Sequence, residues 1–512
     1  MGSILNPSRS PLVGGPPSPR DLRIRLFLFL IWMVLVAWFM SGHVFWRDEV
    51  RGFSLALSGS NVVEMLRNVH GEGHPALWYL ILRGAHNITP YREVLPVMGA
   101  LFGFLAMGVF VFRSPFRTII VGLVLFSLYG AFEYVVVARN YGLSAFVMFV
   151  IAALYHRIKG TLWFGLLLLI LCNTSVLSCI LAAAFLLFRV IEAMGERPTM
   201  TRRSWSVMFG NMVLAAIGAW ICFRTVYPTF NDAAVSSNFG TFTADKLIDA
   251  LLDWKKGFWN LGLPHPLLAL VFCFSLIRRP AAFCAAIAGF IALKMFFYLV
   301  YLSYYRHEIL FVVFLLALHW MVAKGAGGHD SERPATKYVQ FAGQWAFVSL
   351  LFSQSLLLLR PIYEQIVGVP YSRSADVAEL LKRPELSGAI IMADPDTMLE
   401  PLPYYVENPL WMLRQERFGK VVQLTRNARR ELSLDDILAD AARLHRASGR
   451  PILYLSHLRL RSLSKGRQMV LFSHATIVTP ENVRRFRAST RRVASFDRAA
   501  TGESYDVFVY PR

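Results

Sequence analysis

Charged residues are scarce in this chain, and acidic residues are the scarcest. Only 17% of its 512 residues are charged, with 33 Asp and Glu against 53 Lys and Arg, whereas 55% are hydrophobic. So little charge excludes a soluble multidomain protein of this length, and so much apolar surface excludes a disordered chain. Mean hydropathy is +0.45, and several uncharged runs reach the roughly 20 residues that cross a bilayer. The composition therefore predicts a polytopic α-helical membrane protein.

Cysteines are also few, and none lies in a polar segment. All five fall inside apolar runs, so they predict small core residues and no disulfide framework. The cysteines are Cys172, Cys179, Cys222, Cys273 and Cys284. Residues 1–22 are rich in Pro, Ser, Gly and Arg and are followed by an apolar run without an A-x-A cleavage site. We expect a disordered cytosolic tail and an uncleaved first span.

The predicted membrane domain, residues 23–360, contains about eleven candidate spans. These apolar runs lie at about 23–42, 92–112, 118–132, 141–156, 161–174, 176–192, 206–226, 263–277, 281–302, 308–323 and 339–360.

The connecting loops fall into two classes by charge. Alternate loops are basic, at 113–117, 157–159, 197–203, 278–279 and 324–337. Loops 43–91 and 227–262 instead balance basic with acidic residues. Because basic loops stay in the cytosol, this pattern predicts a cytosolic N-terminus. An odd number of spans then places residues 361–512 on the other side of the membrane.

Residues 361–512 form a predicted extracytosolic α/β domain. Short buried strands are expected in GAIIMADPD, GKVVQLT, PILYLSH and YDVFVYP. Ser433 can cap a helix with an apolar stripe running from Leu434 to Leu444. No dinucleotide or P-loop fingerprint accompanies the strands. An accessory domain without chemistry of its own is the simpler interpretation of this region.

Loop 43–91 has the densest polar content near the membrane. Asp48 and Glu49 follow directly after the first span. A helix from about Asn61 to Val69 has one apolar face and is expected to lie flat on the membrane. The apolar segment His74–Leu82 is too short to span and is expected to be interfacial or re-entrant.

Four elements of the chain resemble the GT-C superfamily of polyprenol-phosphate-sugar-dependent glycosyltransferases. This family includes protein O-mannosyltransferases, aminoarabinose transferases and rhizobial galacturonosyltransferases. The elements are Asp48-Glu49 after the first span, GHPALWYLIL closing the first outer loop, FEYxxxARNYGL at 132–143, and Tyr-Tyr-Arg-His at 304–307. The resemblance covers roughly residues 23–325. It implies a GT-C-like fold and inverting transfer from a lipid-phosphate sugar to an acceptor hydroxyl outside the cytosol.

The chemistry of that transfer assigns roles to the polar residues of the outer loops. Attack at an anomeric carbon needs a base, and the carboxylate Asp48 is the candidate, with Glu49 and Glu133 as further acidic residues. The leaving phosphate needs fixed positive charge. The candidates for phosphate binding are His74, Arg139, Arg306 and His307, and those for a sugar-stacking wall are Trp46, Trp78, Tyr79, Tyr141 and Tyr305.

Each of these assignments has a structural alternative. Asp48 is also suited to N-cap a helix over 49–57, and Glu49 to pair with Arg47 or Arg51 at the surface. Because adjacent residues point about 100° apart on a helix, Asp48 and Glu49 are not both expected at one atom.

The residues of the later loops have structural alternatives as well. His74 is also suited simply to start a helix before Pro75. Glu133 is also suited to a structural pair with Arg139, and Arg306 to extend along the membrane interface. The aromatic residues equally suit an interfacial belt.

Two further questions stay open from the sequence. A divalent cation near Asp48 is compatible with the residue types, but no metal-binding spacing is present. A membrane transporter or flippase is the alternative function, and a non-enzymatic assembly or sensor protein is a third. A transporter would place charges at mid-membrane, where Lys294 is the one clear example in the sequence. Glycan, glycolipid and protein acceptors all fit, in the inner membrane of a bacterial cell.

Overall fold

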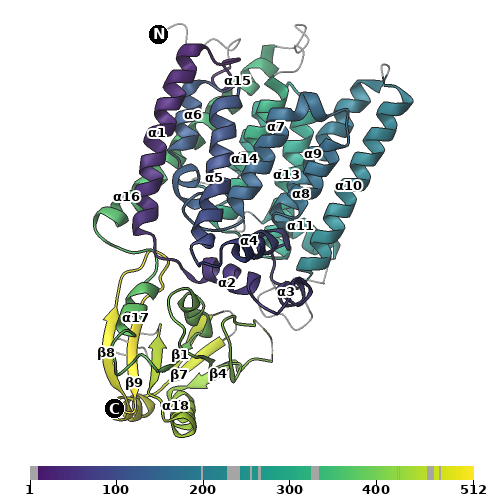
Figure 1. The fold of residues 1–512 in the computed structure, drawn as a ribbon. Coiled ribbons are helices and arrows are strands. Elements are labelled where there is room, and N and C mark those ends of the chain that lie inside the picture. Colours follow the sequence, from purple (N-terminus) through teal and green to yellow (C-terminus); the bar gives the residue numbers. More distant parts are fainter. Residues whose placement is uncertain are drawn as a thin grey trace.

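The structure is a computed structural model that describes most of the chain. The described residues are 10–197, 200–227, 243–253, 257–262, 267–323, 334–423, 425, 427–457, 466–471 and 474–512. Long helices form a bundle at one end, and a smaller α/β domain lies at the other (Figure 1). The N-terminal end of the described chain and the α/β domain lie at opposite ends of the bundle.

Eight helices of the described chain are long and apolar enough to cross a membrane. They are α1 (Pro19–Gly42), α5 (Val94–Arg113), α7 (Tyr141–Ile158), α9 (Val176–Gly195), α10 (Arg202–Val226), α13 (Pro280–Leu299), α14 (Tyr305–Ala323), and α15 (Pro334–Leu357) continued by α16 (Leu359–Ile366). The protein is therefore an integral multi-pass membrane protein, as the composition predicts.

The three remaining predicted spans coincide with shorter apolar elements. These are α6 (Thr118–Leu125) with the π-helical η1 (Tyr129–Glu133), α8 (Trp163–Cys172), and α12 (Leu268–Val271) with the 3₁₀ turn η3 (Phe272–Leu276). At 1.5 Å per residue, a helix as short as α8 reaches about half of the roughly 30 Å apolar core. Eleven complete crossings therefore stay a prediction.

Buried charges in the bundle satisfy main-chain groups near helix ends. Arg25 donates to the carbonyls of Val111, Ser114 and Phe116, at the end of α5. Lys294 donates to the carbonyls of Ala250 (3.0 Å) and Asp253 (2.6 Å), at the end of α11 (Ala244–Leu252). Because each cation binds the carbonyl end of a helix, these residues are structural caps.

Two glycines of α5 allow the segment after η1 to approach very closely. A Cβ atom on Gly103 would lie 2.6 Å from the carbonyl oxygen of Tyr134, and one on Gly99 would lie 2.8 Å from Cα of Ala138. A larger residue would push this segment away from α5. The two glycines thereby set the position of the neighbouring residue Arg139.

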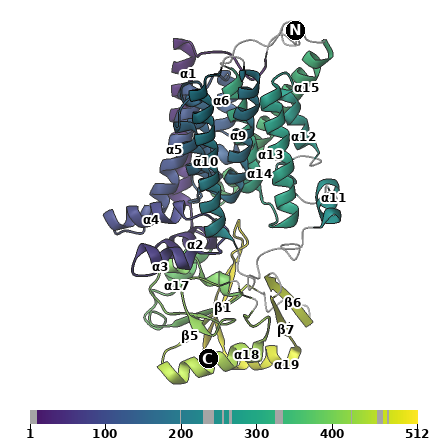
Figure 2. The ribbon, with the colours of Figure 1, turned by 90° about the vertical axis from the view of Figure 1, so that its right-hand side faces the viewer.

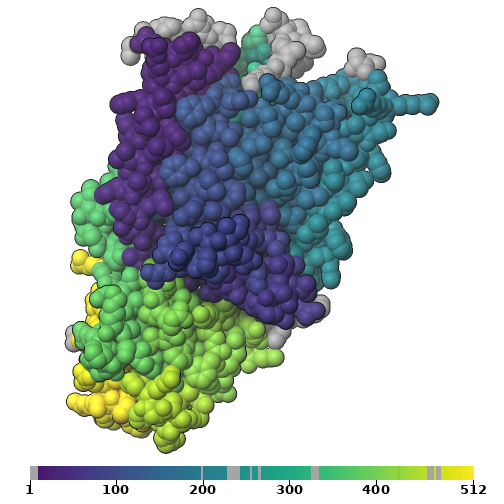
Figure 3. Space-filling model, in the orientation of Figure 1, coloured from purple at the N-terminus to yellow at the C-terminus, as the bar shows by residue number. Residues whose placement is uncertain are grey.

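The loop between α1 and α5 folds into three short helices. They are α2 (Arg47–Ala56), α3 (Val62–Val69) and α4 (Leu77–Ile88). Helix α3 lies where the sequence predicts a short amphipathic helix, and Asn61 caps it by accepting from the backbone N–H of Glu64 (3.0 Å). Figure 2 shows α4 lying across the end of the bundle, in agreement with an element too short to span. In the space-filling view, this loop lies against both the bundle and the α/β domain (Figure 3).

The α/β domain contains a six-stranded mixed sheet of order β3-β2-β1-β5-β9-β8 and a three-stranded sheet of order β4-β7-β6. Strand β1 pairs in parallel with both β2 and β5, and β9 is antiparallel to β5. The strands are β1 (Ile390–Asp394), β2 (Leu410–Met412), β3 (Arg417–Phe418), β4 (Glu431–Ser433), β5 (Ile452–Ser456), β6 (Gly466–Leu471), β7 (His474–Val478), β8 (Arg491–Phe496) and β9 (Tyr505–Tyr510).

Helices cover both faces of the six-stranded sheet. Ile391 and Ala393 pack on the face covered by α17 (Ser374–Leu380) and the turns η4 (Asp396–Leu399) and η5 (Leu402–Tyr404). Ile390 and Met392 pack on the face covered by α18 (Leu434–Ser448) and α19 (Pro480–Ser489).

The predicted strands and helix of this domain agree with the structure in all but one place. Ser433 caps α18, as predicted, and β1, β5 and β9 lie within three of the predicted strand segments. The strand expected in GKVVQLT is wrong, because its described residues form a bend and irregular chain with one isolated bridge residue at Thr425.

Candidate functional site

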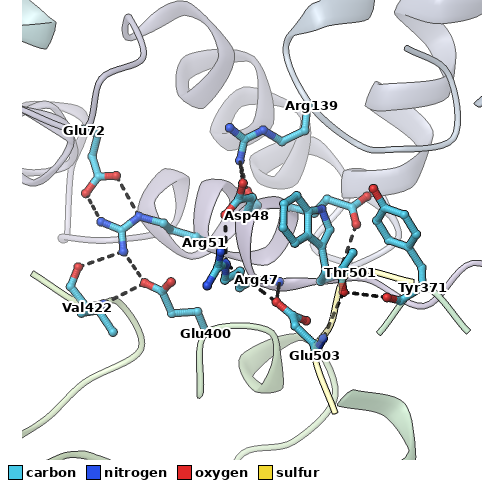
Figure 4. A network of polar contacts seen from close by, with 12 residues as sticks. Arg47, Asp48, Arg51, Glu72, Arg139, Tyr371, Glu400, Val422, Thr501 and Glu503 are labelled. Atoms are coloured by element: carbon cyan, nitrogen blue, oxygen red, sulfur yellow. Dashed lines mark hydrogen bonds and ion pairs between the residues drawn. The ribbon is translucent and has the colours of Figure 1, made fainter. Parts of the chain in front are cut away.

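The residues of α2 face three different surroundings. Arg47 and Arg51, one helical turn apart, face the α/β domain, as Figure 4 shows. Asp48 lies beside Arg139, and Glu49 is buried against the bundle. The helix begins at Arg47 with Trp46 as its N-cap residue, so Asp48 lies in the first turn. The alternative in which Asp48 caps a helix over 49–57 is therefore wrong.

Glu49 connects three parts of the bundle. Both of its carboxylate oxygens lie 3.0 Å from Nε2 of His43, and they accept from the backbone N–H of Trp46 (3.2 Å) and of Ala138 (2.7 Å). The side chain is fully buried. This corrects the alternative of a surface pair with Arg47 or Arg51. Its partners and burial assign Glu49 to holding α2 against the segment before Arg139, and not to the chemistry itself.

Asp48 is the more accessible acidic residue of the pair. Its side chain is 35% exposed, and its oxygens lie 3.5 Å from Nε of Arg47 and 3.8 Å from Nη1 of Arg139. Burial favours a higher pKa, but Arg139, Arg47 and Arg306 outweigh burial and lower the pKa of Asp48 below its usual value. Asp48 is therefore an ionised carboxylate at neutral pH.

Arg139 is fixed from two sides. It donates to the backbone carbonyl of Asp48, and its Nη2 lies 2.8 Å from Nε2 of His74. Burial, followed by the charge of Arg139, lowers the pKa of His74 to about 3. His74 is therefore neutral and accepts a hydrogen bond from the guanidinium. His74 thereby orients Arg139, and its own contact with a phosphate stays a prediction.

Glu133 pairs with Arg306 and not with Arg139. Oε2 of Glu133 lies 3.5 Å from Nε of Arg306, which corrects the partner expected from the sequence. The guanidinium of Arg306 lies 4.7 Å from the ring centroid of Trp46 and is largely buried. Burial of this kind does not fit a side chain that extends along the interface into water. The ring of Trp46 is held by Arg306 and, at 5.8 Å, by Arg47.

The other predicted aromatic residues divide into two groups. Tyr141 stacks on Tyr134 with ring centroids 5.8 Å apart, and the rings of His307 (5.8 Å) and His74 (6.3 Å) lie beside it. The buried hydroxyl of Tyr141 has no hydrogen-bond partner among the described residues.

Trp78, Tyr79 and Tyr305 make packing contacts with other parts of the chain. Trp78 and Tyr79 are buried in a hydrophobic cluster with Val50 and Phe53 of α2. The hydroxyl of Tyr305 donates to Oε1 of Gln354 on α15 (2.7 Å). These contacts give the three residues a packing role, and their part in a sugar-stacking wall stays a prediction.

His307 holds the first turn of α14. Its Nδ1 accepts from the backbone N–H of Tyr304 (3.1 Å), which uses one ring nitrogen. The next residue, Glu308, was not singled out in the sequence. It is fully buried and accepts from Ser303 (2.6 Å) and from the side chain of Asn260 (2.9 Å). The sequence feature that could have indicated Glu308 is a carboxylate inside an apolar helix, since such a group requires buried partners.

The surroundings of Asp48 do not suit a metal ion. Among the described residues, no three His, Cys, Asp or Glu side chains are grouped closely enough to hold one. The groups nearest to the carboxylate are the guanidinium groups of Arg47 and Arg139, which repel a divalent cation. The donor set around Asp48 suits an anionic ligand better.

Four residues of the α/β domain complete the site but were not predicted. Glu503 accepts from the backbone N–H of Arg47 (3.1 Å), and Glu400 accepts from Arg51. Tyr371 packs on His43 and Trp46, with ring centroids at 5.0 and 6.0 Å. The hydroxyl of Tyr405 accepts from the backbone N–H of Phe45 (2.9 Å). The sequence separations are too large for any local pattern to indicate these pairs.

Fold and site together define an integral membrane protein with an arginine-rich polar site where a helical bundle meets an α/β domain. No family model and no curated protein matches the chain. The chain is similar to two crystal structures of ArnT from Cupriavidus metallidurans, one bound to undecaprenyl phosphate and one in the apo state.

The two comparisons have similar extents. With the bound structure the identity is 14% and the TM-score 0.48, over 94% of this chain and 97% of the other. With the apo structure the identity is 13% and the TM-score 0.45, over 95% and 97%.

Proposed function

We infer that this chain is a membrane glycosyltransferase that moves a sugar from a polyprenyl-phosphate donor to an acceptor hydroxyl, with inversion. The observation that carries this proposal is an ionised, partly exposed Asp48 beside Arg139 and within the field of Arg306. A base and fixed cations next to each other at the end of a membrane bundle are what this reaction requires.

The reaction is a single displacement at the anomeric carbon. The acceptor oxygen attacks this carbon while Asp48 takes the hydroxyl proton, and the bond from carbon to the phosphate oxygen breaks. Polyprenyl phosphate leaves with that electron pair, and its charge is stabilised by Arg139 and Arg306. A bound phosphate also offsets the arginine charges that lower the pKa of Asp48. Donor binding would therefore make the carboxylate a stronger base.

We place the site on the non-cytosolic side of the membrane. The basic residues Arg113 and Arg157 lie in the last turns of α5 and α7, and Arg117 follows α5, at the helix ends that point away from the α/β domain. Since basic loops remain in the cytosol, the α/β domain and Asp48 belong outside. An inner membrane of a bacterial cell, with a glycan, glycolipid or protein acceptor, fits this orientation.

The transporter alternative has less support. Lys294, the one clear mid-span charge in the sequence, binds main-chain carbonyls at the end of α11. Its amino group therefore serves a helix terminus, whereas a transport pathway would need charges available to a substrate.

The test compares the cell-envelope glycans of cells that contain wild-type protein, the Asp48→Asn variant, or no protein. Mass analysis should show one sugar modification that requires the wild-type chain. Asp48→Asn should lower transfer by about 10²- to 10⁴-fold, the range for a general base, while binding of undecaprenyl phosphate persists. Glu93→Gln is the matched control, because that side chain is 61% exposed and pairs only with Arg92 among the ion pairs of the described chain. Near-normal turnover by Asp48→Asn would contradict the base assignment.

A further inference from the structure

The α/β domain holds α2 along one face of that helix. Arg47 and Arg51 are four residues apart, so their side chains point the same way. In Figure 4 both reach toward the α/β domain, while Arg139 approaches Asp48 from the bundle. The helix that carries Asp48 is thus held between two parts of the protein.

Arg51 makes the larger of the two contacts. Its guanidinium binds both oxygens of Glu72 in the same loop, Oε1 of Glu400, and the carbonyl of Val422 (2.8 Å). Glu400 is only 2% exposed, and its Oε1 also accepts from the backbone N–H of Val422 (2.9 Å). Burial raises the pKa of Glu400, and Arg51 offsets part of that rise.

Arg47 makes the second contact through its main chain. Its backbone N–H donates to Oε1 of Glu503 (3.1 Å), and its Nε lies 3.9 Å from the same oxygen. Glu503 is 3% exposed. Because Arg47 directly precedes Asp48, this hydrogen bond restrains the backbone next to the proposed base.

Both carboxylates come from one edge of the six-stranded sheet. Glu400 follows the carboxyl end of β1, and Glu503 precedes β9, whose first residues align with the last residues of β5. Strand β1 lies between two parallel neighbours, and the crevice beyond such a strand is where α/β domains commonly bind ligands. Here Glu400, at the carboxyl end of β1, binds the side chain of Arg51.

We propose that Glu400 and Glu503 are positioning residues for sugar transfer, and that the α/β domain acts through them as an internal clamp on α2. This inference rests on the proposed function, in which Asp48 is the base. Neither carboxylate has to touch a substrate. A shift of about 1 Å in a reacting group can lower the rate roughly 100-fold. Contacts that restrain α2 therefore maintain the rate by keeping Asp48 in position.

The test uses the full-length protein in lipid and two substitutions at each position. Glu400→Ala and Glu503→Ala remove the acceptor oxygen, whereas Glu400→Gln and Glu503→Gln retain one. Each Ala variant should lower kcat about 10-fold or more, with donor KM and undecaprenyl phosphate affinity within about twofold of wild type. Each Gln variant should recover part of the loss. Glu407→Ala is the control, since that side chain is 92% exposed on the same domain.

Hydrogen exchange of the α2 amides provides a readout that does not depend on activity. In the Ala variants, the amides of residues 47–56 should exchange faster than in wild type, while the exchange rates of the α5 amides should not change. The exchange rates of the Gln variants should lie between those of the Ala variants and wild type. Unchanged α2 exchange in both Ala variants would overturn the clamp, as would faster exchange with unaltered kcat. If the wild-type chain transfers no sugar, the proposed function fails, and the exchange data still decide whether the two carboxylates hold α2.

Discussion

At the scale of single residues, Asp48 and Glu49 show how neighbours in sequence acquire different roles. Their separation by about 100° around a helix predicted that only one could face a given atom. The sequence favoured Asp48 as the base, but the role of Glu49 could not be predicted, because it depends on His43 and the N–H of Ala138, which surround Glu49. Asp48 remains partly open and lies among arginines.

The two arginines of the site should bind the donor phosphate. Arg139→Ala and Arg306→Ala should each weaken the affinity for undecaprenyl phosphate by about 10-fold or more, since each removes a charge-assisted hydrogen-bond donor, worth about 1.5–3 kcal/mol. Equilibrium binding in detergent or nanodiscs measures this effect. Arg360→Ala is a suitable control, because its side chain is 73% exposed and pairs with Glu364. Unchanged affinity in both variants would remove them from the donor site.

Glu503 should make stability depend on pH. Burial is the main cause that raises its pKa to about 7, and Ser372, Arg47 and Asp48 modify that value. The facing group on β9 is Tyr505. Because the folded pKa is higher than the ordinary value, this residue stabilises the fold most below about pH 4.5, and that contribution is lost as pH rises through 7.

Glu503→Gln should therefore raise the melting temperature relative to wild type at pH 8 and change it little at pH 4.5. The upper bound of the gain is about 3 kcal/mol, from roughly 1.4 kcal/mol per pH unit. Thermal unfolding at the two pH values measures the effect. An equal shift at both values would show that ionisation of Glu503 is not responsible.

At the scale of elements, local signals predicted most of the short helices. The apolar face of residues 61–69 predicted α3, and Ser433 predicted the start of α18. The strand predicted in GKVVQLT was wrong because a run of β-branched residues forms a strand only beside a partner. In the structure β3 is the outer strand on this side of the six-stranded sheet, next to β2. The GKVVQLT segment instead contacts Arg51 through the carbonyl of Val422.

The close approach of α5 to the segment before Arg139 should be sensitive to one methyl group. In Gly103→Ala the new Cβ would meet the carbonyl oxygen of Tyr134 at 2.6 Å and Cα of Val135 at 2.8 Å. Because these are backbone atoms, relief requires the segment to move, at a cost of about 1–3 kcal/mol.

Gly108→Ala on the same helix is the matched control, since its Cβ would meet nothing within 4 Å. Gly103→Ala should lower both the melting temperature and transfer, whereas Gly108→Ala should be neutral or slightly stabilising. Equal effects of the two changes would show that helix propensity, and not the contact with Tyr134, determines the result.

At the scale of the whole molecule, the orientation of the chain should be visible by chemical labelling. Single cysteines at Ser60 and Arg430, both at exposed positions, should react with a membrane-impermeant maleimide from outside the cell. The background is a variant without the five native cysteines. Ser60 is preferable to Gly59, whose φ of 71° disfavours any side chain. Labelling at only one of the two positions would mean an odd number of crossings between them, and would contradict the predicted orientation.

The overall division of the molecule was predictable, but the contact between its two parts was not. Apolar run length and loop charge predicted the bundle and the separate α/β domain. Arg51 and Glu400 lie 349 residues apart, and Arg47 and Glu503 lie 456 apart. Neither carboxylate lies in a motif that indicates its partner. Only the folded chain shows that the α/β domain completes the surroundings of α2.

These long separations also determine when α2 can be completed during synthesis. Arg47 and its partner Glu503 are 456 residues apart, so at about 5–20 residues per second the second leaves the ribosome about 20–90 s after the first. During that interval every later span must insert and the α/β domain must be made and folded. A chain that stalls before this point would hold Asp48 on an unsecured helix. Full activity would thus be reserved for molecules whose translocation is finished.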